Sequence, residues 1–367
     1  MGSCNSHEIF VKETKKTDND NTKKQEIRNK NKEIKDIDKK FDGDNQENKV
    51  KYKITIKYFL KSKRGKGKYN IFGLTFVNNN KDNLELIING TPHILVDTYE
   101  LEEGYNEVTI VFKRNLIALN NMFFGCTTLC DISGLKYIDV SQSISFSCMF
   151  VLCQSLTDIS ALQNWDVSNG KSFYCMFGSC TSLSDITPLK NWNVSKGNNF
   201  NEMFKGCESL SDITALKNWD VSNGIKFNSM FSICVSLSDL TPLQNWNISN
   251  GIKFNSMFSL CKSLSDLTPL QNWNVSKCND FSYMFDGCKN LSDIRPLENW
   301  DVSNGINFKR MFAGCGLSDV SHLKNWDVSK GINFECIFKE CELLLDITPL
   351  QNWNIPNDKQ KFFDDGN

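Results

Sequence analysis

The chain is organised around a block of about 27 residues that recurs from about residue 119 to residue 356. The block reads Phe-x-x-Met-Phe-x-x-Cys-x-Ser-Leu-x-Asp-Ile-x-x-Leu-x-Asn-Trp-[Asp/Asn]-Val-Ser, and it accounts for every tryptophan. Its cysteine marks nine coils, with the last step one residue shorter: Cys126, Cys153, Cys180, Cys207, Cys234, Cys261, Cys288, Cys315 and Cys341. Self-similarity at a fixed period of this length predicts a solenoid, in which each unit buries its apolar face against its neighbours.

Within one coil, the spacing of apolar residues suggests two kinds of local structure. Phe173, Met176, Phe177 and Cys180 lie at i, i+3, i+4 and i+7, which predicts a helical turn or two with one apolar face. The following leucines and isoleucine have a spacing like that of leucine-rich repeats, and the Trp-x-Val alternation suggests an extended piece. Five coils carry a proline before the last leucine, which predicts a corner through which no helix continues: Pro188, Pro242, Pro269, Pro296 and Pro349.

The phrases Met-Phe-x-x-Cys-x-Ser-Leu and Asn-Trp-[Asp/Asn]-Val-Ser-x-Gly resemble the BspA-like leucine-rich repeats and their relatives in mycoplasma-type surface proteins. The likeness covers about two thirds of the chain, and both phrases recur in the same order in nearly every coil. The resemblance implies a right-handed α/β solenoid that serves binding, adhesion or scaffolding rather than catalysis. The fold expected is therefore an α/β, leucine-rich-repeat-like solenoid of about nine coils.

The first six residues, Met1-Gly2-Ser3-Cys4-Asn5-Ser6, fit the pattern for N-myristoylation on Gly2 after removal of Met1. Cys4 is placed for S-palmitoylation, which would supply the second anchor that stable membrane attachment needs. This hypothesis applies in a eukaryotic cell, because a bacterium would not read the motif. No segment is long and apolar enough to predict a membrane span, and no apolar stretch suggests a secretory signal.

Changes in composition divide the chain into five parts. Residues 7–49 are rich in Lys, Asn, Asp and Glu, which predicts a disordered tether. Residues 50–115 show the alternation of β-strands, with Asn89-Gly90 as a turn, and we expect them to cap the open N-terminal end of the solenoid. The parts are an acylation signal (1–6), a disordered linker (7–49), a β-rich cap (50–115), the repeat solenoid (116–356) and a C-terminal tail (357–367).

A basic segment lies between the first two expected strands. It is interpreted as a solvated hairpin tip or as a contact for anionic lipid headgroups. Its five basic residues are the candidates for membrane contact: Lys61, Lys63, Arg64, Lys66 and Lys68.

Three polar or reactive ladders run through the repeats. The nine cysteines are expected to be buried core residues rather than metal ligands, and Cys148, Cys175 and Cys336 lack the spacing of common zinc sites. The aspartates, one per coil from Asp131 to Asp346, are expected to accept backbone N–H groups at turns, with bound calcium as the alternative. The asparagines before each Trp, from Asn164 to Asn352, are expected to satisfy backbone groups along the stack.

Composition and motifs limit the classes of function that we expect for this chain. With 42 basic and 43 acidic residues the chain has no net attraction to nucleic acid, and without an export signal its 15 cysteines suggest reduced thiols. We found no phosphate loop, nucleophile elbow or zinc-binding helix, so we expect no catalytic residues, metal or cofactor.

Two functional classes fit these observations. The first is a non-enzymatic protein-binding scaffold on the cytoplasmic face of a membrane, held by Gly2 and Cys4 and contacting a protein partner through the solenoid. The second is a surface or secreted adhesin of the BspA-like type. Glycans on the sequons at Asn193, Asn247 and Asn274 would mark an exported form. The sequence does not determine the oligomeric state.

Overall fold

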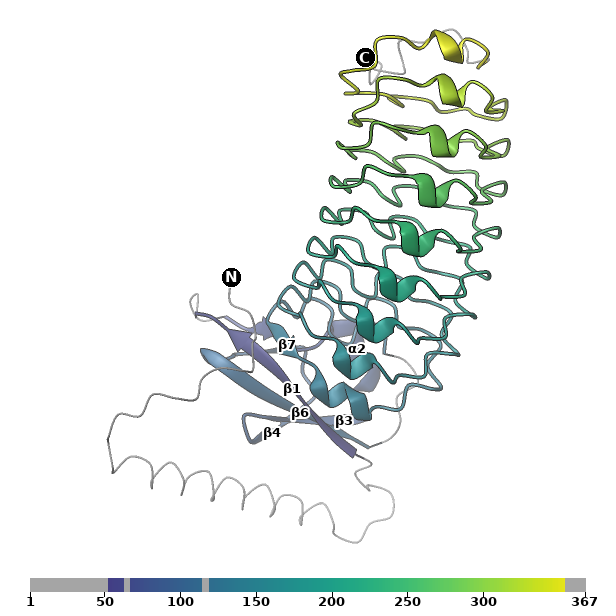
Figure 1. Cartoon of the computed structure of the whole chain (residues 1–367). Coiled ribbons are helices and arrows are strands. Elements are labelled where there is room, and N and C mark those ends of the chain that lie inside the picture. The colour runs from purple at the N-terminus through teal and green to yellow at the C-terminus, as the bar shows by residue number, and fades with distance from the viewer. Residues whose placement is uncertain (1–51, 63–66, 114–118, 354–367) are drawn as a thin grey trace.

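The computed structural model describes residues 52–62, 67–113 and 119–353, and it shows a stack of coils rising from a small β-sheet (Figure 1). The predicted acylation signal with Gly2 and Cys4, the predicted tether and the predicted C-terminal tail all lie outside the described residues. The stack of coils confirms the repeat solenoid that the period predicts. The local backbone structure within each coil differs from the expected helix and strand.

The N-terminal part is a five-stranded antiparallel sheet in the order β4-β3-β6-β1-β7, with a second, two-stranded sheet of β2 and β5. Asn89 and Gly90 both have positive φ and join β3 to β4, as the Asn-Gly turn signal predicts. A short helix, α2, adds Phe76 and Val77 to the core. The elements are β1 (Tyr52–Leu60), β2 (Tyr69–Asn70), α2 (Leu74–Asn80), β3 (Leu84–Ile88), β4 (Thr91–Ile94), β5 (Thr98–Tyr99), β6 (Gly104–Phe112) and β7 (Leu129–Asp131).

The sheet and the stack share one hydrophobic core. Strand β7 belongs to the first coil, yet it pairs with β1, with Lys57 opposite Asp131 and Tyr58 opposite Leu129. The Tyr58 side chain is fully buried at this junction, and its hydroxyl donates a hydrogen bond to the Ile71 carbonyl. The first coil thus has a hydrogen-bonded neighbour on its N-terminal side, which is what a capping element supplies.

The segment from the first Phe to the ladder cysteine is not a helix, and the prediction of helical turns there is wrong. It consists of two consecutive β-turns: in the third coil Met176 N–H donates to Phe173 O (3.2 Å) and Cys180 N–H to Phe177 O (3.1 Å). The third residue of each turn, Cys175 or Ser179, has positive φ (53° and 57°). A left-handed residue every four positions cannot occur within an α-helix. The apolar side chains still point inward at i, i+3, i+4 and i+7.

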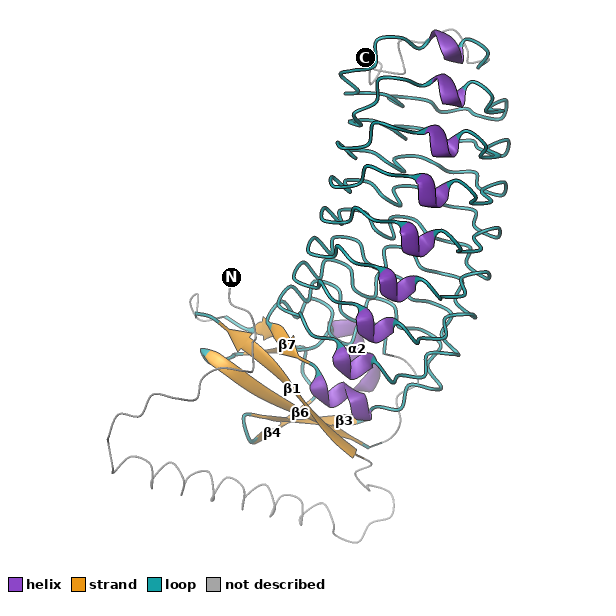
Figure 2. Cartoon of the chain, in the orientation of Figure 1, coloured by secondary structure: helices purple, strands orange, loops and turns teal. Residues whose placement is uncertain are grey.

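Short 3₁₀ helices lie where the sequence predicted a corner, and Figure 2 shows them aligned in one column along the stack. In five coils proline is the second residue of this turn, where its fixed φ suits the helix and its missing N–H costs no hydrogen bond. The elements are η1 (Ser133–Tyr137), η2 (Ser160–Leu162), η3 (Thr187–Leu189), η4 (Thr214–Leu216), η5 (Thr241–Leu243), η6 (Thr268–Leu270), η7 (Arg295–Leu297), η8 (Ser321–Leu323) and η9 (Thr348–Leu350).

Neighbouring coils are joined by backbone hydrogen bonds rather than by long strands. Alternate residues of the two turns donate to the next coil, as Phe173 N–H does to Asn199 O (2.9 Å) and Cys175 N–H to Asn201 O (2.8 Å). The expected strand in each coil is reduced to one bridging residue, in a parallel series from Ser145 to Asn333. Buried side chains add bonds to the preceding coil: the Trp192 indole donates to Leu162 O (3.0 Å).

The ladder cysteines are buried, with exposed fractions of 0–5%, so the prediction that they are core residues is confirmed. Each thiol from Cys153 onward also donates to a phenylalanine carbonyl of the preceding coil, as Cys180 Sγ does to Phe150 O (3.0 Å). Burial raises the pKa of Cys180 well above its ordinary value, which keeps this thiol protonated and able to donate.

The first phenylalanine of each coil stacks on that of the next, and this stack has one fault. Ring centroids from Phe146 to Phe254 lie 5.4–5.6 Å apart, and those from Phe281 to Phe334 lie 5.2–5.4 Å apart. Among the described rings, no such stack joins Phe254 to Phe281. The fault coincides with Cys278, a buried residue that replaces the glycine found three residues before this phenylalanine in the neighbouring coils.

Candidate binding surface

One surface of the solenoid differs from coil to coil, and we call it the turn face. It consists of the second and third residues of the two β-turns in each coil, which in the third coil are Tyr174, Cys175, Gly178 and Ser179. The first and fourth residues of each turn fill the core, whereas the second and third range from buried, as Cys336 is, to exposed, as Tyr174 is. The framework requires a left-handed backbone at the third residue of each turn, but different side chains occupy these positions from coil to coil.

The composition of the turn face changes along the stack. Its N-terminal third carries Ser147, Cys148, Tyr174 and Cys175, and its middle third carries the ion pair of Glu202 and Lys205 followed by short polar and aliphatic residues. Charged residues occupy the C-terminal third: Asp286, Lys309, Arg310, Glu335, Lys339 and Glu340. The chemistry of this surface thus changes along the stack, and charged residues are most frequent in its C-terminal third.

Inter-coil contacts hold the side chains of the turn face in place. Asn228 donates its backbone N–H to Asn201 Oδ1 (3.0 Å) and its side-chain amide to Asn255 Oδ1. Ser147 bridges Ser145 and Ser172 through hydroxyl contacts of 2.9 and 2.8 Å. A surface whose side chains are already ordered loses less conformational entropy when a partner binds.

Ion pairs fix the charged zone. Arg310 Nη2 lies 3.0 Å from Asp286 Oδ1, and Lys309 Nζ lies 2.9 Å from Glu335 Oε2. Partial burial raises the pKa of Asp286 above its ordinary value, although the charge of Arg310 acts in the opposite direction. The carboxylate and guanidinium are both mostly shielded from solvent, so this pair is a fixed feature of the surface.

The surface beside the 3₁₀ column, in contrast, repeats the same chemistry in every coil. The ladder aspartate accepts the backbone N–H two residues later, as Asp185 Oδ1 does from Thr187 (2.8 Å). The same bond occurs in all nine coils, which confirms the prediction that these carboxylates satisfy turn N–H groups. The residues that the structure describes contain no group of three His, Cys, Asp or Glu side chains able to hold a metal ion.

The predicted amide ladder occurs on a different asparagine. The asparagine before each Trp is exposed, from Asn164 to Asn352. In four coils the asparagine four residues after Trp bonds to the preceding coil instead, as Asn169 Nδ2 does to Ser141 O (2.8 Å). Both asparagines recur in the same phrase, and only the direction of the chain after Val167 decides which one reaches its neighbour.

The sequons at Asn193, Asn247 and Asn274 are exposed on the same side of the coil as this phrase. Each of their Oδ1 atoms accepts the backbone N–H of the serine two residues later, at 3.1–3.2 Å. Aspartate makes the same bond in other coils, as Asp220 Oδ1 does from Ser222 N–H (3.0 Å). The asparagines thus have a structural role that requires no modification.

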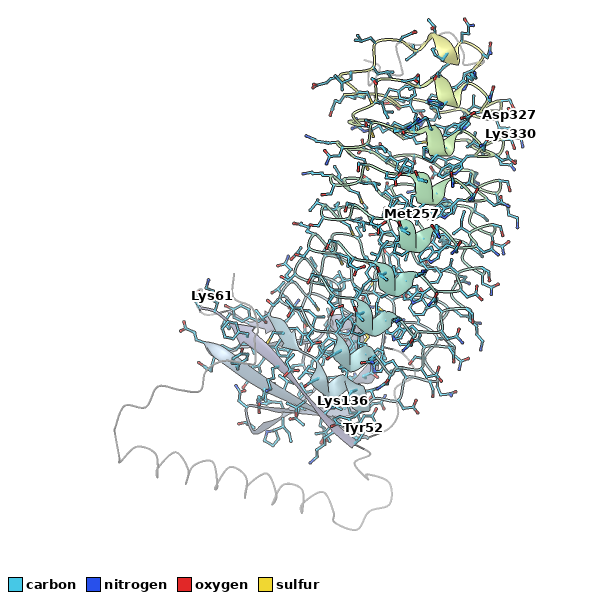
Figure 3. All side chains as sticks on the ribbon, in the orientation of Figure 1. Tyr52, Lys61, Lys136, Met257, Asp327 and Lys330 are labelled. Carbon is cyan, nitrogen blue, oxygen red and sulfur yellow. The ribbon has the colours of Figure 1, made fainter. Side chains whose placement is uncertain are left out.

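Of the basic segment, the structure describes Lys61 and Lys68, which are both exposed; Lys63, Arg64 and Lys66 lie outside the described residues, as do Gly2 and Cys4. The strands on either side of the segment, β1 and β2, lie in different sheets and do not pair as a hairpin. Figure 3 shows Tyr52 and Lys61 at opposite ends of β1. Lys61, the first residue of the basic segment, therefore lies about 27 Å from Tyr52, the first residue that the structure describes.

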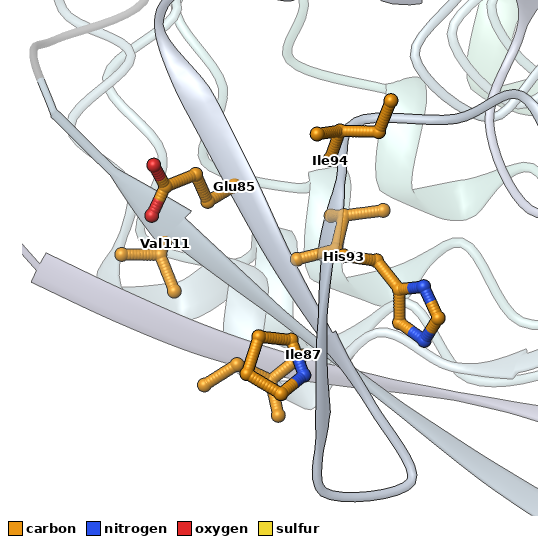
Figure 4. A pocket seen from close by; sticks show the side chains of 7 residues that line it. Glu85, Ile87, His93, Ile94 and Val111 are labelled. Carbon is orange, nitrogen blue, oxygen red and sulfur yellow. The ribbon is translucent and has the colours of Figure 1, made fainter. Parts of the chain in front are cut away.

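A shallow hollow of about 350 Å³ lies on the outer side of β3, β4 and β6. Its lining is mainly aliphatic, with Glu85 and His93 at opposite sides (Figure 4). The carboxylate of Glu85 is paired with Lys113 at 2.8 Å, and His93 Nε2 lies 3.4 Å from the hydroxyl of Tyr99. The hollow thus offers mainly apolar contacts.

The sequence contained a signal for the turns that the periodicity concealed. Gly206, Gly287 and Gly314 occupy the third position of the second turn, and each has positive φ. Glycine in a helix interior lowers stability by about 0.5–1 kcal/mol relative to alanine, whereas glycine readily adopts the left-handed conformation of a turn. Recurrent glycines at one position of an otherwise helical pattern therefore predict turns, and with them the turn face.

No helix within the described residues combines the length and apolar character needed to cross a bilayer. No curated protein and no solved structure matches the chain. Three overlapping segments, residues 112–213, 187–293 and 265–365, match DUF285, a family described as Mycoplasma protein of unknown function. The three segments cover more than half of the chain and follow the tandem coils, so the protein belongs to this mycoplasma-type repeat family.

Proposed function

We propose that this protein is a non-enzymatic scaffold that binds a protein partner through the turn face. The observation that carries the proposal is the difference between repeated and variable positions within each coil. Core and turn-capping residues repeat through the stack, whereas the turn-face residues vary and are held in fixed positions by neighbouring coils. Stacked repeats with one variable surface are a common arrangement for protein binding.

We expect substitutions on the turn face to weaken partner binding and the same substitutions elsewhere to have little effect. Ser229→Arg with Ser256→Arg would place two large cations in the middle zone. Arg310 occupies the equivalent left-handed position with φ 53°, so the backbone accepts arginine there. Ser238→Arg with Ser265→Arg, on the exposed 3₁₀ side of the same coils, is the matched control.

The measurement is quantitative affinity capture from the native cell with each full-length double variant. Loss of a captured protein by about tenfold or more with the turn-face variant alone would support the proposal, since buried unpaired charge at an interface costs several kcal/mol. Equal capture by both variants would place the binding surface elsewhere. Circular dichroism at rising temperature checks that both variants are folded.

The proposed scaffold is held on the cytoplasmic face of a membrane by acyl chains on Gly2 and Cys4. The sequence pattern supports this part, since one acyl chain binds a bilayer only reversibly and two bind it stably. Gly2→Ala should release the protein from the membrane fraction, and Cys4→Ser should leave it partly bound. Sedimentation with membranes and labelling with a myristate analogue measure both.

The outcome that contradicts the anchor is a Gly2→Ala protein that sediments with membranes as fully as the parent. In that case an exported, adhesin-type protein becomes the better proposal. Glycan mass on peptides containing Asn193, Asn247 or Asn274 would then identify passage through a secretory pathway, because these side chains are exposed.

A further inference from the structure

Cys148 and Cys175 are stacked neighbours on the turn face. Both occupy the third position of the first β-turn, in the second and third coils, with φ of 56° and 53°. Cys148 N–H donates to Tyr174 O at 2.8 Å, so the two backbones are hydrogen-bonded in register at this point. Backbone segments that are hydrogen-bonded side by side lie about 4.8 Å apart, within the Cα separation of about 4.4–6.8 Å that a disulfide requires.

The two side chains lie beside each other and affect each other's pKa. The interaction with Cys175 lowers the pKa of Cys148 below its ordinary value, although partial burial and Glu202 act against this. The same interaction raises the pKa of Cys175. Gly178 provides the space: a Cβ at this residue would lie 2.4 Å from Cys175 Sγ. The pair thus combines a more acidic thiol with a second thiol positioned beside it.

The ladder cysteines of the same coils provide a contrast within the chain. Cys153 and Cys180 are separated by the same 27 residues, yet both are fully buried. Their thiols donate to Phe123 O and Phe150 O at 3.2 and 3.0 Å, and burial raises the pKa of both well above the ordinary value. Cys148 and Cys175 are only partly buried, and each affects the pKa of the other.

We propose that Cys148 and Cys175 form a thiol–disulfide exchange site, in which low-molecular-weight disulfides oxidise the pair to an inter-coil disulfide. Cys148 is the attacking residue and Cys175 the resolving residue. The disulfide would join the second and third coils covalently on the surface that we propose binds a partner. The site itself depends only on the geometry of the two coils, so it stands independently of that function.

The exchange proceeds in two displacements. The Cys148 thiolate attacks one sulfur of the disulfide, forms a mixed disulfide and expels the other half as a thiolate. The Cys175 thiolate, formed when its proton passes to solvent, then attacks Cys148 Sγ and expels the second half. The protein has lost two protons and two electrons, and the small disulfide has gained them as two thiols. Excess thiol reverses both steps.

The test treats the reduced, full-length protein with oxidised glutathione, traps free thiols with an alkylating agent and analyses peptides by mass spectrometry without reduction. We expect a linked pair of peptides containing Cys148 and Cys175, lighter by two hydrogens than the separate peptides. It should form at least about tenfold faster than any bond or adduct at Cys153 or Cys180, because reaction requires an accessible thiolate.

Single variants test the two roles. In Cys175→Ser the glutathione adduct on Cys148 should accumulate, because no thiol resolves it. In Cys148→Ser, Cys175 should react more slowly than Cys148 does in Cys175→Ser. Separate adducts on both cysteines of the parent, a ladder disulfide formed at an equal rate, or no reaction at Cys148 would each overturn the proposal.

Discussion

Replacing Trp246 by alanine is expected to lower the free energy of unfolding by about 3–5 kcal/mol. The indole is 4% exposed and lies 6.4 Å from the ring of Phe227, centroid to centroid. Its N–H donates to Leu216 O at 3.0 Å, so truncation leaves a large cavity and removes one of the two donors to this carbonyl, the other being the Trp219 N–H at 3.1 Å. Equilibrium denaturation in urea, followed by circular dichroism, measures the change.

Trp353→Ala is the matched comparison, and we expect a smaller loss. Its indole makes the equivalent bond to Leu323 O (3.2 Å), and its ring lies 5.9 Å from that of Phe334, as Trp246 lies beside Phe227. It lies in the last coil of the described chain, however, where Ile332 and Leu345 are 82% and 93% exposed. In a stack stabilised by nearest neighbours, a terminal coil has fewer contacts to lose. Equal losses for both variants would contradict this gradient.

Gly224→Cys is expected to destabilise the protein by about 1–3 kcal/mol through overpacking. A Cβ at Gly224 would lie 2.3 Å from Cζ of Phe227 and 2.8 Å from the Val221 carbonyl oxygen. Because Phe227 is stacked on both Phe200 and Phe254, its ring cannot move without breaking two contacts. Thermal unfolding of the variant and the parent measures the loss.

The reverse substitution, Cys278→Gly, is the control that the chain itself offers. The aromatic stack is already interrupted at Phe281, and the hydrogen bond from Phe254 N–H to Asp280 O is long at 3.3 Å. Removing the Cys278 side chain therefore introduces no new overlap with a phenylalanine ring. We expect a smaller loss of stability than for Gly224→Cys. If Gly224→Cys lowers the stability less than Cys278→Gly does, the Cys278 side chain does not cause the interruption of the phenylalanine stack.

The sequence predicted the core because the repeat imposes the same environment on each equivalent residue. A residue such as Phe177, Cys180 or Trp192 recurs at one period, and burial of one member implies burial of all. Local turn chemistry was equally informative: Asn89-Gly90 predicts its turn, and Asp185 predicts a carboxylate that accepts a backbone N–H group. These features depend on short-range geometry that a single stretch of sequence contains.

The conformation of the first half of each coil was not predictable from the same pattern. Apolar residues at i, i+3, i+4 and i+7 share one face in a helix, and two successive β-turns also direct them to one side. The difference lies in where the backbone N–H groups donate. The N–H of Phe173 or Cys175 reaches the next coil instead of its own, and that choice exists only when a second coil is stacked in register.

The sequence by itself determined the repeat period, the identity of the buried ladder residues and the family. The tertiary structure alone decided which residues from different coils become neighbours. Cys148 and Cys175 are 27 residues apart in sequence, and only the register of stacking places them in neighbouring turns. The same register makes Arg310 the partner of Asp286. Contacts between coils depend on how far the chain advances in each turn of the solenoid, and backbone hydrogen bonding between coils sets that advance.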